Sequence, residues 1–95
     1  MGVSGGEEGA RNHSSLMPDG SFEAFKYIEH ILLKVTAQVP DSAPCMTYIG
    51  KGGSGNFVKM IHNGIEHGDM QLITKAYDLL KSVEKLSNEK LQSVF

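Results

Sequence analysis

The chain has 95 residues, a net charge of −2 and a hydrophobic content of 40%, which allows the core of one small domain at most. With no excess of basic side chains, we expect neither nucleic acid nor an anionic membrane surface as a partner. No apolar run approaches the roughly 20 residues of a membrane span. The single cysteine, Cys45, cannot form an internal disulfide and fits a reducing compartment. We expect no metal site.

Residues 2–20 are predicted to be a loop. Within it, residues 3–6 resemble the end of a strand that breaks into a glycine turn. The Ser4 hydroxyl and the backbone N–H groups of Gly5 and Gly6 could hold a carboxylate or hydroxyl groups there. An ordinary flexible terminus explains the same residues, so the segment alone leaves both interpretations open.

The next segment predicts a helix of about 17 residues that starts after an N-cap at Ser21 and stops before Pro40. Its apolar residues recur every three or four positions, which is the spacing of a packing face. A turn and a short strand at residues 45–49 follow. We expect Cys45 to be a small core residue, because no base partner is evident. The apolar residues of this helix are Phe22, Phe25, Ile28, Leu32, Val35 and Val39.

A glycine-rich turn then precedes the longest predicted helix, which continues without proline to at least Val83. Such a turn brings the backbone of a helix start close to a ligand. Apolar residues on one side of this helix predict a packing face. Ser87 is a plausible N-cap for a further helix at the end of the chain. The turn glycines are Gly50, Gly52, Gly53 and Gly55, and the predicted packing face comprises Phe57, Ile61, Ile65 and Leu72.

The opposite side of the long helix carries polar groups of mixed chemistry at spacings of three and four, which place them in one stripe. A solvated face is the commonest explanation for such a stripe. Gly64 and Gly68 argue against it here, because each costs roughly 1 kcal/mol relative to alanine inside a helix. A ligand or another backbone close to the helix would explain them. The stripe comprises Lys59, His62, Asn63 and Glu66.

These residues resemble a known family. The signature G-x-x-G-x-G-x-x-x-K-x-x-x-N of the β-hydroxyacid dehydrogenases matches at Gly50, Gly53, Gly55, Lys59 and Asn63. The longer run FVKMIHNGIEHGDMQLI, preceded by VSGGEEGA and SLMP in the right order, resembles the 6-phosphogluconate dehydrogenases in particular. The resemblance covers essentially the whole chain and is closest to plant forms.

The resemblance implies a mostly helical α/β fragment. Residues 1–50 would form the C-terminal part of an NADP-binding domain with a Rossmann-type fold, and residues 51–95 would begin an all-α domain. The dinucleotide fingerprint G-x-G-x-x-G is absent, and in the family it lies upstream of residue 1, so the cofactor-binding residues are unknown. We therefore expect an internal fragment or a truncated gene model of a longer enzyme, inactive by itself.

The resemblance also implies the reaction, which is oxidative decarboxylation of 6-phosphogluconate to ribulose 5-phosphate and CO₂ with NADP. This is a step of the pentose phosphate pathway and of gluconate utilization, carried out by a cytoplasmic homodimer or, in plants, also in plastids. Lys59 matches the general base, which must be neutral to act, and Glu66 matches the acid that protonates carbon. The matching substrate-binding residues are Ser4, Gly5, Gly6, His62, Asn63 and His67, the last standing where the family has a tyrosine that contacts the substrate phosphate.

Three other interpretations account for parts of the sequence. A dehydrogenase of a smaller 3-hydroxy acid shares the Gly, Lys and Asn signature but leaves Glu66 unexplained. A nucleotide-binding P-loop fails because Asn56 and Phe57 replace its Lys and Ser or Thr. A remnant without catalysis, which only binds or oligomerises, stays open.

Overall fold

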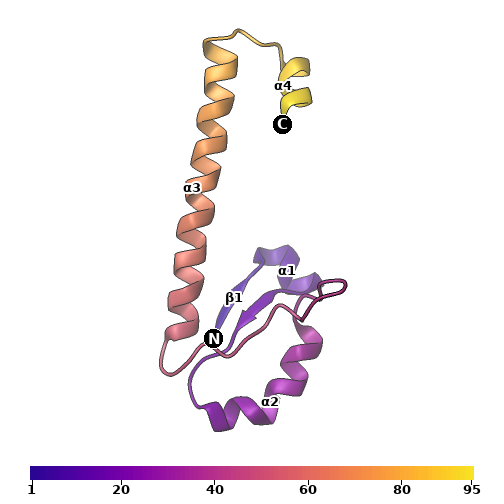
Figure 1. The fold of residues 1–95 in the computed structure, drawn as a ribbon, viewed down its shortest axis with the longest axis vertical. Helices are drawn as coiled ribbons and strands as arrows, with labels where there is room; N and C mark the ends of the chain where they lie inside the picture. Colours follow the sequence, from indigo (N-terminus) through magenta and orange to yellow (C-terminus); the bar gives the residue numbers. More distant parts are fainter. The chain divides into compact units, whose positions relative to one another are not determined.

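The computed structural model describes all of residues 1–95, which form two compact units, Met1–His62 and Asn63–Phe95. The first unit contains β1 (Gly2–Ser4), α1 (Gly6–Asn12), β2 (Ser15–Met17) and α2 (Phe22–Val35). Helix α3 (Ser54–Ser82) begins in the first unit and continues without interruption into the second, which also holds α4 (Asn88–Val94) (Figure 1). The predicted fold class, a mostly helical α/β fragment, is confirmed.

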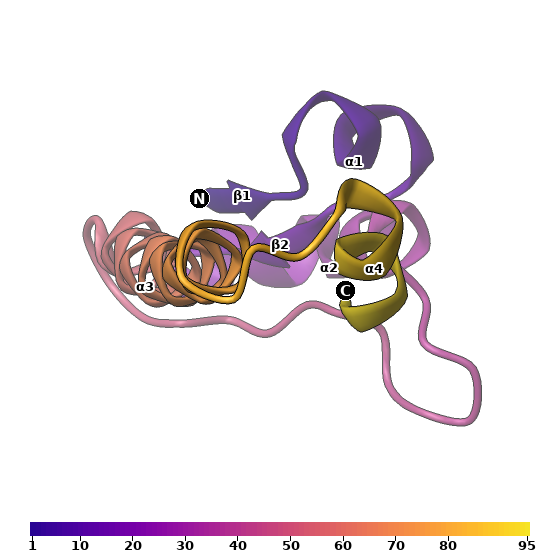
Figure 2. The same cartoon turned by 90° about the horizontal axis from the view of Figure 1, so that it is seen from above.

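The N-terminal segment contains two strands and a helix, so the loop predicted for residues 2–20 was wrong, although the strand end expected before the glycine turn is present as β1. Strand β1 pairs antiparallel with β2, with Gly2 opposite Met17 and Ser4 opposite Ser15. Figure 2 shows α1 joining the end of β1 to the start of β2. The predicted turn is confirmed at Gly5 and Gly6, whose φ angles of 145° and 60° favour glycine. Elements this short are stabilised by pairing, and they leave no periodic signal in the sequence.

Helix α2 begins at its predicted cap, where the Ser21 hydroxyl accepts the Ala24 N–H at 3.3 Å. It ends at Val35 rather than continuing to Val39 as predicted. The reason is Thr36, which is fully buried and extended, and whose hydroxyl lies 2.9 Å from the Ser14 carbonyl oxygen and 2.8 Å from that of Cys45. These tertiary hydrogen bonds override the apolar periodicity that continues beyond Val35.

After α2 the chain returns alongside β2, in the manner of a parallel crossover. The Leu16 N–H donates to the Cys45 carbonyl at 3.0 Å, and the Ile49 N–H donates to the Pro18 carbonyl at 2.9 Å. The short strand predicted at residues 45–49 is absent, because the segment makes only isolated bridges. A continuous ladder cannot form here, since β2 is short and Pro18 has no N–H to donate.

The core of the first unit is small. Leu16 and Met17 of β2 and Phe25 of α2 are its buried apolar residues. The Tyr48 ring packs against Phe25 with 5.2 Å between ring centroids, and the Tyr48 hydroxyl donates to the Gly20 carbonyl at 2.6 Å. The Tyr48 ring is thus partly buried with its polar end satisfied, which fixes the returning segment against α2.

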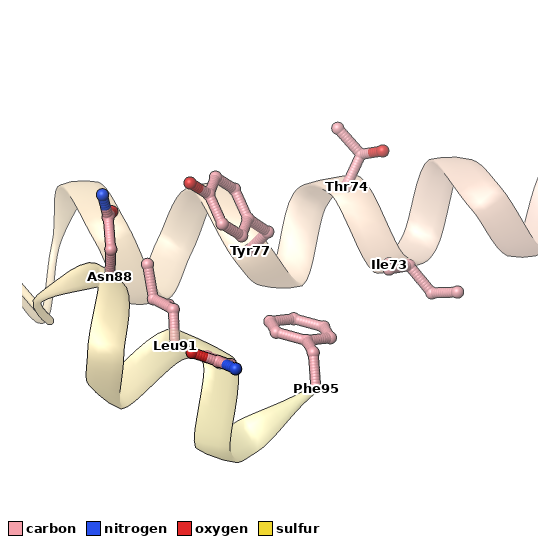
Figure 3. Close-up of a pocket in the computed structure, with 7 residues that line it drawn as sticks. Ile73, Thr74, Tyr77, Asn88, Leu91 and Phe95 are labelled. Atoms are coloured by element: carbon pink, nitrogen blue, oxygen red, sulfur yellow. The ribbon is translucent and has the colours of Figure 1, made fainter.

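In the second unit, α4 packs against the C-terminal half of α3. The predicted cap is confirmed, because the Ser87 hydroxyl accepts the Lys90 N–H at 3.4 Å. Leu91 is buried, and the Tyr77 and Phe95 rings approach with 6.2 Å between centroids. Figure 3 shows these side chains in the largely apolar groove between the two helices, which is lined by Ile73, Thr74, Tyr77, Asn88, Leu91, Gln92 and Phe95.

Much of the predicted packing surface is not covered within the chain. The four apolar residues expected to form the packing face of the long helix are between 49% and 67% exposed. Phe22, Ile28 and Val35 of α2 are also exposed. No helix is both long enough and apolar enough to cross a membrane.

The hydrogen bonds of the Thr36 hydroxyl should contribute to the stability of the fold. Thr36→Val keeps the side-chain shape but leaves the Ser14 and Cys45 carbonyl groups without the hydroxyl, so we expect a loss of about 1–3 kcal/mol in the free energy of unfolding. Urea unfolding of the 95-residue chain, followed by circular dichroism, measures the change. Thr36→Ser keeps the hydroxyl and is the matched control. Equal urea midpoints for the valine and unsubstituted chains would contradict the role given to these bonds.

Candidate active site on helix α3

The glycine-rich turn places the start of α3 directly against the hairpin. Gly50 and Gly52 have φ angles of 152° and 65°, which favour glycine. Gly55 is buried, and a Cβ there would lie 2.1 Å from the Met17 carbonyl oxygen and 3.0 Å from the Gly2 nitrogen. The close approach predicted for this turn is therefore present at Gly55, but the approaching group is the chain's own hairpin.

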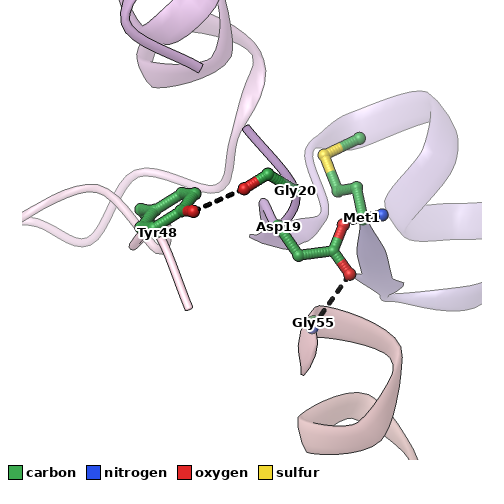
Figure 4. Close-up of polar contacts among 5 residues, drawn as sticks. All are labelled: Met1, Asp19, Gly20, Tyr48 and Gly55. Atoms are coloured by element: carbon green, nitrogen blue, oxygen red, sulfur yellow. Dashed lines mark hydrogen bonds and ion pairs between the residues drawn. The ribbon is translucent and has the colours of Figure 1, made fainter. Parts of the chain in front are cut away.

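The N-terminus of α3 is capped from a distance by Asp19. The first turn of α3 has no acidic residue of its own. Instead, Asp19 Oδ2 accepts the Gly55 N–H at 3.0 Å, while Oδ1 pairs with the Met1 amine (Figure 4). A carboxylate here satisfies an N–H group that the helix leaves unpaired and complements the positive end of its dipole.

The charge of Asp19 follows from its surroundings. The Met1 amine, and then the Gly55 and Asn56 N–H groups, hold the pKa of Asp19 below its ordinary value, against an opposing effect of desolvation. A carboxyl group with a lowered pKa contributes its stabilisation above the unfolded-state pKa and loses it as the pH falls through the folded-state pKa. The cap is therefore fully charged at neutral pH.

Lys59 lies one helical turn beyond Gly55, on the side of α3 that faces β1. It is partly buried, and its Cβ is 3.0 Å from the point where a Cβ on Gly2 would be. Ser4 follows two residues later on the same strand, about 7 Å along it at the usual rise, and leads into Gly5 and Gly6. Lys59, the predicted base, thus lies close to β1, and the predicted substrate-binding turn follows the same strand.

The other predicted site residues also lie on α3. His62 is exposed and belongs to the first unit. In the second unit Asn63 is partly buried, and Glu66 and His67 are exposed. Asn63 and Glu66 are three residues apart and share a face of the helix.

The two glycines inside α3 adjoin open space. A Cβ at Gly64 or at Gly68 would meet no atom within 4 Å in residues 1–95. Neither glycine is therefore required by packing within the chain.

Two positions at the site were missed from the sequence. Asp19 and Gly2 are far from α3 along the chain, and nothing local connects either of them with it. The sequence offers one indirect signal for Asp19. The first turn of the long helix has no acidic residue, so its free N–H groups need a cap from another segment.

The residues present do not form a dinucleotide site. A pyrophosphate is held by free backbone N–H groups at a helix N-terminus that follows a G-x-G-x-x-G turn. That fingerprint is missing, and the Gly55 N–H of α3 already donates to Asp19. Across residues 1–95, no group of three His, Cys, Asp or Glu side chains could hold a metal ion.

Comparison with known proteins yields two family models that match adjacent parts of the chain. Residues 1–50 match the NAD binding domain of 6-phosphogluconate dehydrogenase. Residues 55–95 match the 6-phosphogluconate dehydrogenase C-terminal domain. Together the two matches leave only residues 51–54 outside.

Curated relatives match over the whole chain. A rice protein, 6-phosphogluconate dehydrogenase, decarboxylating 1, is 81% identical over 95 residues, which are 100% of this chain and 20% of that protein. An Arabidopsis thaliana protein, 6-phosphogluconate dehydrogenase, decarboxylating 2, is 78% identical over the same 95 residues, again 20% of its length. A chloroplastic Arabidopsis form is 70% identical. The chain therefore spans about one fifth of the length of these relatives.

A solved structure agrees with the fold. Plasmodium falciparum 6-phosphogluconate dehydrogenase, described in its apo form, with its cofactor NADP⁺ and with its substrate 6-phosphogluconate, superposes with a TM-score of 0.92 at 56% identity. The match covers 99% of this chain and 20% of that one. Since a family model matches more than half of the chain and a second matches nearly all of the rest, this chain belongs to the 6-phosphogluconate dehydrogenase family.

Proposed function

We propose that this chain supplies part of the substrate side of an enzyme that oxidises and decarboxylates 6-phosphogluconate to ribulose 5-phosphate and CO₂. The observation that carries the proposal is the position of Lys59, partly buried against β1, the strand that leads into the Ser4-Gly5-Gly6 turn. The high identity to the rice relative across the whole chain supports the substrate and the reaction.

The NADP site and the rest of both domains belong to other parts of the whole protein. Residues 1–50 are the end of an NADP-binding domain and residues 51–95 begin an all-α domain, in accord with the ranges of the two family matches. NADP serves as the hydride acceptor and is held by parts of the whole protein other than residues 1–95. The whole protein acts as a homodimer in the pentose phosphate pathway, in the cytoplasm, although chloroplastic relatives leave a plastid form open.

Lys59 handles the protons at the substrate oxygen. An alcohol can be oxidised at carbon only as its O–H proton leaves, and the neutral Lys59 amine takes that proton. The product is a 3-keto acid. When its carboxylate departs as CO₂, the electron pair of the broken C–C bond moves toward the carbonyl, and Lys59 returns the proton to that oxygen. The Lys59 Cβ lies close to Gly2 of β1, which sets where the lysine side chain begins.

Glu66 completes the reaction at carbon. Loss of CO₂ leaves an enediol, and Glu66 donates a proton to the carbon that lost the carboxylate, while the enediol O–H proton passes to Lys59. The product is a ketone, ribulose 5-phosphate. A carboxyl group can donate in this way only if it is protonated at working pH, so the bound substrate and the rest of the enzyme must favour the neutral acid.

The remaining site residues bind and orient the substrate. Hydroxyl and backbone N–H groups of Ser4, Gly5 and Gly6 suit the carboxylate and hydroxyl groups. His62 and Asn63 orient hydroxyl groups, and His67 contacts the phosphate.

The first test is that the 95-residue chain alone is inactive. Catalysis requires a bound hydride acceptor and binding energy from the whole substrate, and residues 1–95 do not form the dinucleotide site. NADPH formation, followed by its absorbance, should stay at background with saturating 6-phosphogluconate. The rice relative is the positive control. Turnover by the chain close to that of the rice relative would contradict the proposal.

The second test uses a chimera, in which this chain replaces the matching 95 residues of the rice relative. Lys59→Met should abolish nearly all oxidation, since the base at the hydroxyl is lost. Glu66→Gln should lower kcat by a factor on the order of 10²–10⁴ and mainly slow the protonation of carbon. Lys75→Met and Glu84→Gln, at exposed positions, are the matched controls. Raised KM with unchanged kcat in both site variants would make the residues binding groups only.

The third test concerns His67 in the same chimera. An imidazole N–H can donate to a phosphate as a phenol O–H does, so KM for 6-phosphogluconate should change little in the His67→Tyr variant. A much lower KM for the tyrosine variant would indicate a weakened phosphate contact and would contradict the role proposed for His67.

A further inference from the structure

We propose that Asp19 is a positioning residue for Lys59, because its carboxylate fixes the first turn of α3 against the hairpin and so sets where Lys59 meets β1. The inference rests on the proposed role of Lys59 and extends it to a residue outside the glycine turn and the helix.

The path from the carboxylate to the lysine is short. Asp19 Oδ2 accepts the Gly55 N–H at 3.0 Å. In an α-helix the carbonyl of residue i accepts the N–H of residue i+4, so the Gly55 carbonyl is the partner of the Lys59 N–H. Gly55 is thus the only residue between the carboxylate and the Lys59 backbone. A shift of Gly55 would move Lys59 with it.

The start of α3 has little else to hold it. The preceding turn contains Gly50, Gly52 and Gly53, which restrict the backbone less than any other residue would. Ser54, the first residue of α3, does not cap the helix, because its Oγ is buried without a hydrogen-bond partner. The close fit of Gly55 against Met17 leaves no room for a side chain at Gly55, but it does not by itself hold the helix in place.

Asp19 itself is held firmly on both sides. The Gly20 N–H donates to the Gly50 carbonyl at 2.9 Å, and the Ile49 N–H donates to the Pro18 carbonyl at 2.9 Å. The Tyr48 hydroxyl donates to the Gly20 carbonyl at 2.6 Å (Figure 4). The Asp19 side chain is only 8% exposed. The carboxylate therefore reaches α3 from a rigid support that is continuous with β2.

Loss of this contact should affect chemistry more than binding. Proton transfer needs the reacting atoms in place, and a displacement of about 1 Å can cost on the order of 10²-fold in rate. Ser4, Gly5 and Gly6 follow β1 and do not depend on the cap of α3, whereas His62, Asn63 and His67 lie on α3 beyond Lys59 and would shift with it. Asp19→Ala should therefore lower kcat by a larger factor than it raises KM for 6-phosphogluconate.

The experiment uses the rice chimera described above. There the Met1 nitrogen becomes a peptide N–H, while the contacts of Asp19 with the Gly55 and Asn56 N–H groups remain. We expect kcat to fall about 10–100-fold in Asp19→Ala. Asp19→Asn keeps an oxygen that can accept the Gly55 N–H and should recover much of the loss. Asp41→Asn, in an exposed turn at φ 61°, is the matched control and should behave as the unsubstituted chimera.

A kcat that falls by a larger factor than KM rises, partly restored in Asp19→Asn, supports positioning. If Asp19→Ala fails to fold, Asp19→Asn decides: a modest fall in kcat there supports positioning, and a raised KM with unchanged kcat would overturn the inference. Unchanged kcat in Asp19→Ala, alongside an inactive Lys59→Met, would overturn positioning and leave the proposed function intact. An inactive unsubstituted chimera, or an active Lys59→Met variant, would overturn the proposed function and this inference with it.

Discussion

The hydrogen bond from the Gly55 N–H to Asp19 connects the two structural features on which the site depends, the N-terminal hairpin and helix α3. The hairpin presents the Ser4 turn, and the helix presents Lys59. Because Gly55 has no side chain, the helix can approach until the Met17 carbonyl would overlap any Cβ. Gly55 thus makes both the close contact with Met17 and the hydrogen bond to Asp19. The position of the first turns of α3 is therefore sensitive to changes at Met17 or Asp19.

The surfaces that the chain leaves exposed are consistent with its share of the family's length. It spans about one fifth of its curated relatives, and the apolar side of α3 is exposed over much of its length. A chain this short has few elements with which to cover two long amphipathic helices. Some of the proposed site residues, His62, Glu66 and His67, are also exposed. Residues 1–95 contain the groups proposed to act on the substrate but not the dinucleotide fingerprint.

Local chemistry made part of this structure predictable. The Ser21 and Ser87 caps, the glycine turn after β1 and the long helix all follow from residues within a few positions of each other. Other features depend on partners that are distant in sequence. Thr36 ends α2 through carbonyl groups from two other segments, and Asp19 caps a helix that begins far downstream. No periodicity or propensity encodes such pairs, so the hairpin, the early end of α2 and the remote cap were missed.

The central claim is that the face of α3 bearing Lys59 meets the substrate beside β1. A crystal structure of the rice chimera with 6-phosphogluconate bound tests it most directly. The account predicts the Lys59 amine within hydrogen-bonding distance, about 3 Å, of a substrate hydroxyl, with Ser4 and the glycines after it contacting the same molecule. Substrate bound away from this face, with Lys59 directed into solvent, would contradict the account.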